Sequence, residues 1–150
     1  EIRLSLVGSE MCIRDSITLT LCACGPSSPD ERLNQAINQL EDGIESRDRE
    51  QVTSLLHPEF SAQDQFDNAW AERNLRLMFL QNQRISVIVS SQETTIDPGY
   101  PERAETTARA TLTGAERFLP NSAGQYDIRL LWLDTDGEWL LRDIDWQRVR

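Results

Sequence analysis

The sequence predicts an α+β domain in which three N-terminal helices pack on an antiparallel sheet. The first observation is that the hydrophobic period changes once along the chain. Apolar residues recur every three or four positions between residues 30 and 83, and from residue 84 they recur at every second position. The second is the Asp134-Thr-Asp-Gly137 segment, a strong hairpin-turn signal between two alternating runs.

Three helices are expected before residue 84. Ser28 is the N-cap of the first, with Pro29 at its first position and Glu31 closing a capping box. Its apolar face holds Leu33, Ile37, Leu40 and Ile44. Asp48 caps a second, shorter helix that Pro58 stops, and residues 66–83 form the third.

Four strands are expected after the helices. Residues 85–90 begin the first, and residues 104–113 alternate cleanly between apolar and polar side chains. Residues 125–133 and 138–146 form the hairpin around the Asp134–Gly137 turn.

Composition limits the classes of partner. The 150 residues amount to one domain, and 39% of them are hydrophobic. No apolar run approaches the ~20 residues of a membrane-spanning helix. The net charge of −10 argues against nucleic acid as a partner, because phosphate binding needs clustered positive charge.

Residues 1–16 resemble translated sequencing-adapter contamination, and we exclude them from the expected fold as a non-native artefact. The alternative is a natural leader that starts at Met11. An acid at Asp15 and an apolar stretch of only residues 17–23 argue against that alternative.

Residues 17–25 resemble the end of a bacterial lipoprotein signal peptide. Leu21 stands three residues before Cys24 and small Ala23 directly before it, as in a lipobox. The resemblance implies cleavage after Ala23, lipid attachment to Cys24 and a lipidated tether over residues 24–29. An ordinary cysteine-containing segment is the alternative. Gly25 after the cysteine resembles the signal for outer-membrane sorting, so we expect a lipid-anchored protein of the outer membrane that faces the periplasm.

Two segments resemble the nuclear-transport-factor-2-like (SnoaL-like) superfamily over residues 30–150. Residues 46–60 look like its second helix and exit, where the His57-Pro-Glu-Phe60 run leads into a first short strand in that family. Residues 136–146 look like its final hairpin, with Asp-Gly-Glu-Trp. The resemblance implies a strongly curved sheet that forms a cone with a pocket. Isomerases, hydrolases, dehydratases and many non-catalytic modules share this cone, so the fold does not settle function.

Asp143 and Asp145 are the candidate catalytic residues. Simple alternation places both on one face of the last strand with Trp139 and Leu141, and a carboxylate inside an apolar pocket suits proton transfer. Exposed strand acids are the alternative, which we favour.

The remaining candidates are weaker. His57, the only histidine, is expected to be structural. An isomerase of the ketosteroid type also needs a tyrosine in the cone, and the chain offers only Tyr100 in a loop and Tyr126 at a strand start. The four tryptophans suit core packing better than a ligand cage. No metal-ligand spacing is present and no cofactor is expected.

The sequence therefore predicts a tethered lipoprotein whose domain binds a small hydrophobic ligand or a protein partner without catalysis. A small-molecule isomerase, dehydratase or hydrolase that uses Asp145 or Asp143 is the alternative. A homodimer is left open.

The lipid anchor is testable through Cys24, the only cysteine that would survive cleavage after Ala23. The Cys24→Ser variant should incorporate no labelled fatty acid and should be released or left unprocessed, because the thiol that receives the lipid is gone. Equal labelling of the variant and the parent would exclude the anchor.

Overall fold

A computed structural model describes residues 28–113 and 124–149. Residues 1–16, residues 17–23 and Cys24 with its tether to residue 27 lie outside the described residues. From Arg32 onward the chain forms one compact unit, and the packing below concerns that unit.

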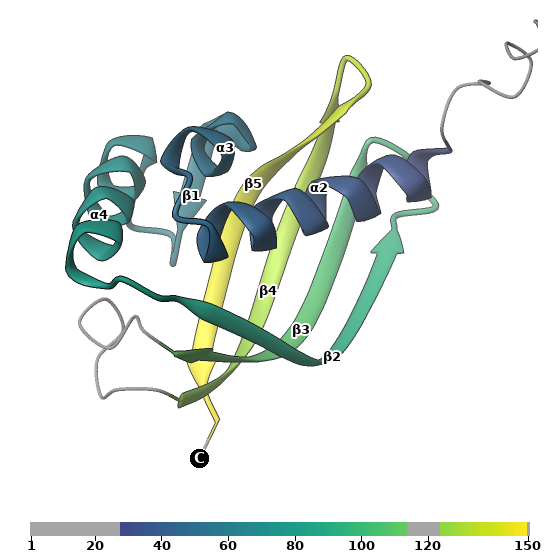
Figure 1. Cartoon of the computed structure of the whole chain (residues 1–150). Coiled ribbons are helices and arrows are strands. Elements are labelled where there is room, and N and C mark those ends of the chain that lie inside the picture. Colours follow the sequence, from purple (N-terminus) through teal and green to yellow (C-terminus); the bar gives the residue numbers. More distant parts are fainter. Residues whose placement is uncertain (1–27, 114–123, 150) are drawn as a thin grey trace, which may run out of the picture. The chain divides into compact units, whose positions relative to one another are not determined.

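Three helices and five strands make up the described chain (Figure 1). The helices are α2 (Pro29–Glu45), α3 (Arg49–Ser54) and α4 (Asn68–Gln81). The strands are β1 (Leu56–Ala62), β2 (Ser86–Ile96), β3 (Arg103–Thr113), β4 (Gly124–Thr135) and β5 (Glu138–Arg148). The α+β class is confirmed, and all three helices precede the four long strands.

The expected helix starts are confirmed by their caps. The Ser28 hydroxyl accepts a hydrogen bond from the Glu31 amide at 3.2 Å, and the Ser28 amide donates to the Glu31 carboxylate at 2.9 Å, which completes the capping box. Asp48 accepts from the Gln51 amide at 3.0 Å at the start of α3. The third helix begins at Asn68 because Asp67 caps it.

The sheet has the order β1-β5-β4-β3-β2 and is mixed, so the expectation of a wholly antiparallel sheet is wrong at one edge. β1 pairs in parallel with β5, and it lies between α3 and α4 in the chain. Only the family resemblance of the His57–Phe60 run implied a short strand here, because Pro58 makes the local pattern unlike a strand. Pro58 is tolerated here because β1 is an edge strand with one neighbour.

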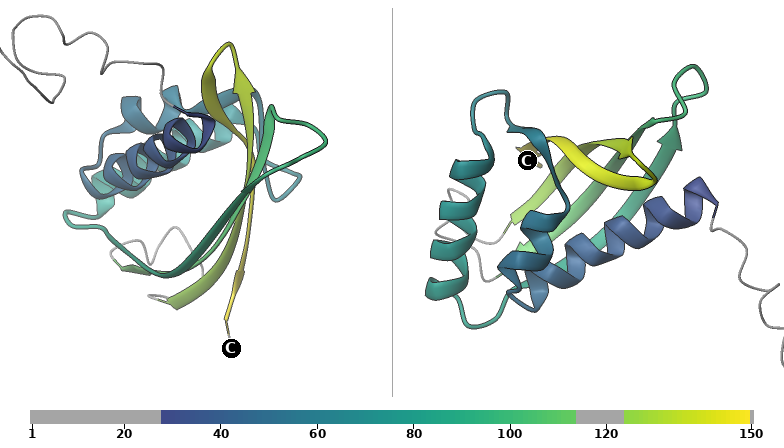
Figure 2. Two further views of the ribbon diagram at one scale, coloured as in Figure 1. Left: turned by 90° about the vertical axis from the view of Figure 1, so that its right-hand side faces the viewer. Right: turned by 90° about the horizontal axis from the view of Figure 1, so that it is seen from above.

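Two strands contain a β-bulge. Val89 and Ser91 of β2 pair with consecutive residues of β3, which leaves Ser90 unpaired. In β5, Leu141 and Asp143 pair with consecutive residues of β4, which leaves Arg142 unpaired. A bulge bends its strand and reverses the alternation of side chains beyond it, and Figure 2 shows the sheet strongly curved with the helices on its concave side.

The core consists of two clusters under the helices. The larger joins α2 to the middle of the sheet around Trp132, which is fully buried, with Trp139 and Leu141. The smaller joins α3 and α4 through Val52 and Met78, among others. Arg32 fixes α2 to the β4–β5 hairpin through an ion pair of 3.3 Å with Asp134 and a hydrogen bond to the Gly137 carbonyl.

Gly43 tests the packing of α2 on α3. An added Cβ at Gly43 would lie 2.8 Å from Cγ2 of buried Val52, a stiff β-branched side chain. Alanine normally stabilises a helix by about 1 kcal/mol relative to glycine. Overpacking costs roughly 1–3 kcal/mol, so Gly43→Ala should lower the free energy of unfolding in urea denaturation. Asn38→Ala on the exposed side of α2 is the control and should not destabilise. A gain for Gly43→Ala would contradict the packing.

Candidate functional site

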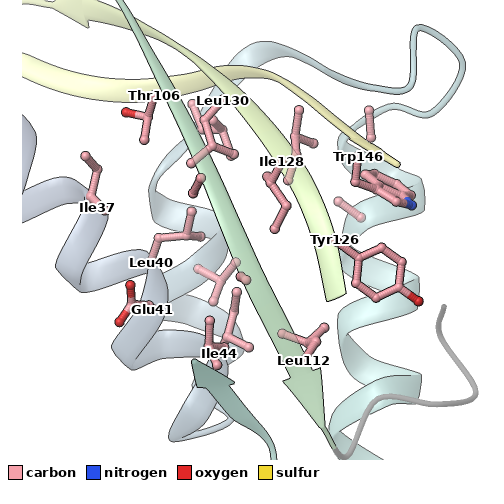
Figure 3. Close-up of a pocket in the computed structure, with 18 of the residues that line it drawn as sticks. Ile37, Leu40, Glu41, Ile44, Thr106, Leu112, Tyr126, Ile128, Leu130 and Trp146 are labelled. Atoms are coloured by element: carbon pink, nitrogen blue, oxygen red, sulfur yellow. The ribbon is translucent and has the colours of Figure 1, made fainter. Parts of the chain in front are cut away.

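An apolar cavity of about 220 Å³ lies between the helices and the concave face of the sheet (Figure 3). It is lined from all three helices and all five strands of the described chain. Aliphatic side chains such as Ile37, Leu40, Ile128 and Leu130 form most of its wall. The cavity borders both core clusters, because Ile37 and Leu130 belong to the larger one, and Val52 and Met78, which also line it, belong to the smaller.

Small side chains leave this space open. Ala62, Ala71, Ala108 and Ala110 all line the cavity, so the strands and α4 present methyl groups where larger residues would fill the core. Protein interiors normally pack without voids of this size. The cavity therefore follows from residue size at four positions.

Glu41 is the one carboxyl group on the cavity wall. It follows Leu40 on the cavity side of α2, and its carboxylate has no hydrogen bond or ion pair among the described residues. Burial raises the pKa of the Glu41 carboxyl above its usual range, and the negative charges of Glu45 and Asp42 raise it further. The cavity thus carries a single acid, and its surroundings raise the pKa of that acid.

Tyr126 is the second polar group that sequence reasoning did not place here. It is 4% exposed and lines the cavity from β4, and its buried hydroxyl has no hydrogen-bond partner among the described residues. Figure 3 shows Glu41 beside the aliphatic side chains of α2, and Tyr126 beside Trp146 on the other side of the view. The signal available in the sequence was alternation along β4, since Tyr126, Ile128, Leu130 and Trp132 are spaced by two and share the inner face.

Asp143 and Asp145 do not line the cavity. The expectation that they share a face with Trp139 and Leu141 is wrong, because the bulge at Arg142 reverses the alternation. Beyond it Ile144 and Trp146 line the cavity, and the two acids point to the opposite face of the sheet.

The outer face of the sheet carries ion pairs around these acids. Asp145 accepts a hydrogen bond from Arg129 at 2.9 Å, and Arg129 also pairs with Glu105 at 3.5 Å. Asp143 is half-buried, and one of its carboxylate oxygens has no hydrogen-bond partner in the part of the chain that the structure describes. Burial raises the pKa of the Asp143 carboxyl, with further contributions from the charges of Asp145 and Asp64.

The other sequence candidates lie in structural positions. His57 is in β1, where its Nδ1 accepts a hydrogen bond from the Glu59 amide at 3.0 Å. Trp132 and Trp139 are core residues, and Trp70 stacks on Phe66 with ring centroids 4.4 Å apart. Among the described residues no group of three or more His, Cys, Asp or Glu side chains could hold a metal ion, and no helix is long and apolar enough to cross a membrane.

Solved structures of similar architecture identify the fold. A candidate dehydratase of the nuclear-transport-factor-2-like family from Streptomyces avermitilis matches with a TM-score of 0.67 at 15% identity, over 82% of this chain and 99% of that one. A candidate ketosteroid isomerase from Shewanella frigidimarina matches with a TM-score of 0.64 at 12% identity, over 80% and 98%. The described chain therefore has the nuclear-transport-factor-2-like fold, also called cystatin-like.

A longer protein contains the same fold. Bd1075 of Bdellovibrio bacteriovorus matches with a TM-score of 0.68 at 10% identity, over 79% of this chain but only 41% of its own length. No protein-family model and no curated protein matches the chain.

The raised pKa of Glu41 predicts a pH-dependent stability. An acid whose pKa is higher in the folded state than in the unfolded state lowers the stability of the fold once the pH rises above its unfolded-state pKa. This loss of stability grows until the pH has passed the folded-state pKa. Glu41→Gln should therefore raise the free energy of unfolding at pH 7 but not below pH ~4, where the carboxyl is protonated in both states. Because the group is only partly buried, we expect a gain of about 0.5 kcal/mol or less.

Urea denaturation at both pH values checks this prediction. Glu50→Gln, an exposed acid on α3, is the matched control and should show no such difference. An equal effect of both substitutions would contradict the raised pKa of Glu41 at the cavity wall.

Proposed function

We propose that this chain is a periplasmic lipoprotein whose cone-shaped domain binds one small, largely apolar ligand without catalysis. The observation that carries the proposal is the cavity of about 220 Å³ with an almost wholly apolar wall. The proposed tether and the lipid on Cys24 rest on the lipobox resemblance in the sequence. In this arrangement the domain holds its ligand close to the membrane.

The size of the cavity limits the ligand. An apolar cavity of roughly 150 Å³ holds benzene, and typical sites for drug-sized molecules are roughly 300–1,000 Å³. The cavity here lies between these values. It suits a single substituted ring or a short branched chain.

Two polar groups define the ligand's chemistry further. A buried hydroxyl without a partner costs roughly 1–3 kcal/mol, so an acceptor on the ligand would stabilise the Tyr126 hydroxyl. Glu41 offers a carboxyl that is unpaired in the described chain. We therefore expect a mainly apolar ligand with one hydrogen-bonding group.

A small-molecule isomerase, dehydratase or hydrolase is the second candidate. The observation that favours it is the acid with a raised pKa on the cavity wall, because proton transfer at neutral pH needs such a group. Glu41 would then be the reacting carboxyl in place of Asp145 or Asp143. The non-catalytic function is preferred because the described wall offers only one acid and no basic side chain for a proton relay.

Filling the cavity tests the binding function. Ala108 lines the cavity from β3, and Ala108→Leu should occupy part of its volume with little change in fold. Toluene, followed by chemical-shift changes of Ile128 and Leu130, should bind the parent and bind Ala108→Leu at least about tenfold more weakly. Native mass spectrometry of protein from its source should show one small bound molecule that Ala108→Leu lacks.

Two variants are matched controls. Ala69→Leu makes the same change at an exposed position of α4, and Asp145→Asn removes an acid of the outer face. Both should bind toluene as the parent does. Unchanged toluene binding by Ala108→Leu would exclude the cavity as the site.

A further inference from the structure

The outward side of α4 carries an arginine and leucine surface that the ligand cavity does not use. Arg73, Arg76, Leu77 and Leu80 are exposed and lie on one side of the helix, because they are spaced by three, one and three residues. Arg84, also exposed, follows the helix end. We call these five residues the α4 surface.

The exposure of the two leucines is unusual for this domain. Leu77 is 52% and Leu80 is 76% exposed, while Leu75 and Met78 on the other side of the same helix are buried in the core. Figure 1 shows α4 at one side of the molecule, with β1 and α3 next to it. The helix thus packs through one face and leaves the α4 surface uncovered within the described chain.

Positive charge gathers on this side of an acidic protein. The described arginines on the sheet and at the start of α2 mostly form ion pairs with acids, as Arg109 does with Asp127 at 2.7 Å. Those without an ion pair among the described residues are Arg47, Arg73, Arg76, Arg84, Arg103 and Arg148. Four of these six belong to the neighbourhood of α4, since Arg47 donates a hydrogen bond to the Phe79 carbonyl at 3.0 Å.

The acids near this helix do not cancel the charge. Glu72 is the one acid within α4, and it pairs with Arg49 at 3.3 Å. Charges more than about 8 Å apart are largely screened at physiological salt, so the net charge of −10 does not prevent local attraction.

We propose that the α4 surface docks on a membrane of anionic phospholipid. Arginine guanidinium groups pair with headgroup phosphates, and exposed leucines beside them enter the boundary between headgroups and acyl chains. An acidic peptide would pair with the arginines but would need apolar residues of its own at matching positions to cover Leu77 and Leu80, whereas a lipid surface supplies phosphates and acyl chains at every position. The combination of both residue types on one helix side favours the lipid surface.

Vesicle binding tests the proposal on the full chain carrying Cys24→Ser, so that no acyl chain contributes. The protein should sediment with vesicles of phosphatidylglycerol and phosphatidylcholine and should not bind phosphatidylcholine alone. Arg73→Gln with Arg76→Gln should weaken binding by roughly tenfold or more, because each arginine contributes near an anionic surface. Leu77→Ser with Leu80→Ser should weaken binding to a similar degree at high salt, where the electrostatic contribution is screened.

Matched controls carry the same changes elsewhere. Arg103→Gln with Arg148→Gln removes two exposed arginines without ion pairs, and Ile88→Ser removes a 58% exposed apolar residue on β2. Neither should alter vesicle binding. Circular dichroism confirms that each variant is folded.

Three outcomes would overturn the proposal. One is equal binding to neutral and anionic vesicles, and another is an equal loss in the control variants. The third is a dimer in solution that Leu80→Ser dissociates, which would make the α4 surface an interface between two copies of the chain.

Discussion

The bulge at Arg142 decides which side chains the last strand presents to the cavity. Before it Trp139 and Leu141 face inward, and after it Ile144 and Trp146 do. Without the unpaired residue Asp143 and Asp145 would face inward, and two charged groups would have to be buried in an apolar space at high cost. A shift of one residue in the register of β5 therefore separates an apolar cavity from an acidic one.

A second β-bulge contributes to the shape of the cavity. The second bulge, at Ser90, lies in β2 at the far edge of the sheet, and bulges increase the bend and twist of a strand. A curved sheet cannot be covered evenly by straight helices, so α2 and α4 with α3 contact it in two places and the core divides into two clusters. The cavity borders both clusters, with alanines where it approaches β3 and α4. Curvature and small side chains together account for the opening.

An apolar cavity and a buried Tyr126 hydroxyl without a partner among the described residues both lower stability, and this cost is consistent with the proposed binding function. Filling a cavity of this kind is normally stabilising, and Tyr126 could be phenylalanine without loss of packing volume. Natural proteins tolerate such departures mainly where function needs them. A ligand that fills the cavity and accepts a hydrogen bond from the Tyr126 hydroxyl would recover part of this cost.

Local sequence signals predicted most of the fold. The candidate site was harder to predict, because it depends on pairing between distant strands. Local structure could be predicted at the helix caps Ser28 and Asp48 and at the Asp134–Gly137 turn, because each acts over only three or four residues. In the turn, Asp136 and Gly137 have positive φ angles of 54° and 88°, as a tight hairpin requires. The short strand β1 was implied only by the family resemblance, and its parallel pairing with β5 was missed, because that pairing joins residues about 80 positions apart and Pro58 opposes a strand locally. The bulge at Arg142 has no sequence signature either, since it depends on the register with β4.

This difference explains why the fold was predicted better than the site. Strict alternation is a sound rule for β3, where Ala104, Thr106 and Ala110 are buried as expected, because β3 pairs with β4 without a shift. It fails on β5, whose register does shift, and there it placed acids in the cavity. Glu41 was missed for a related reason. An acid between Leu40 and Asp42 on α2 looks like a solvent-facing residue until the position of the curved sheet is known. Residues on helix faces beside an apolar stripe therefore become functional candidates only when the sheet they cover is known.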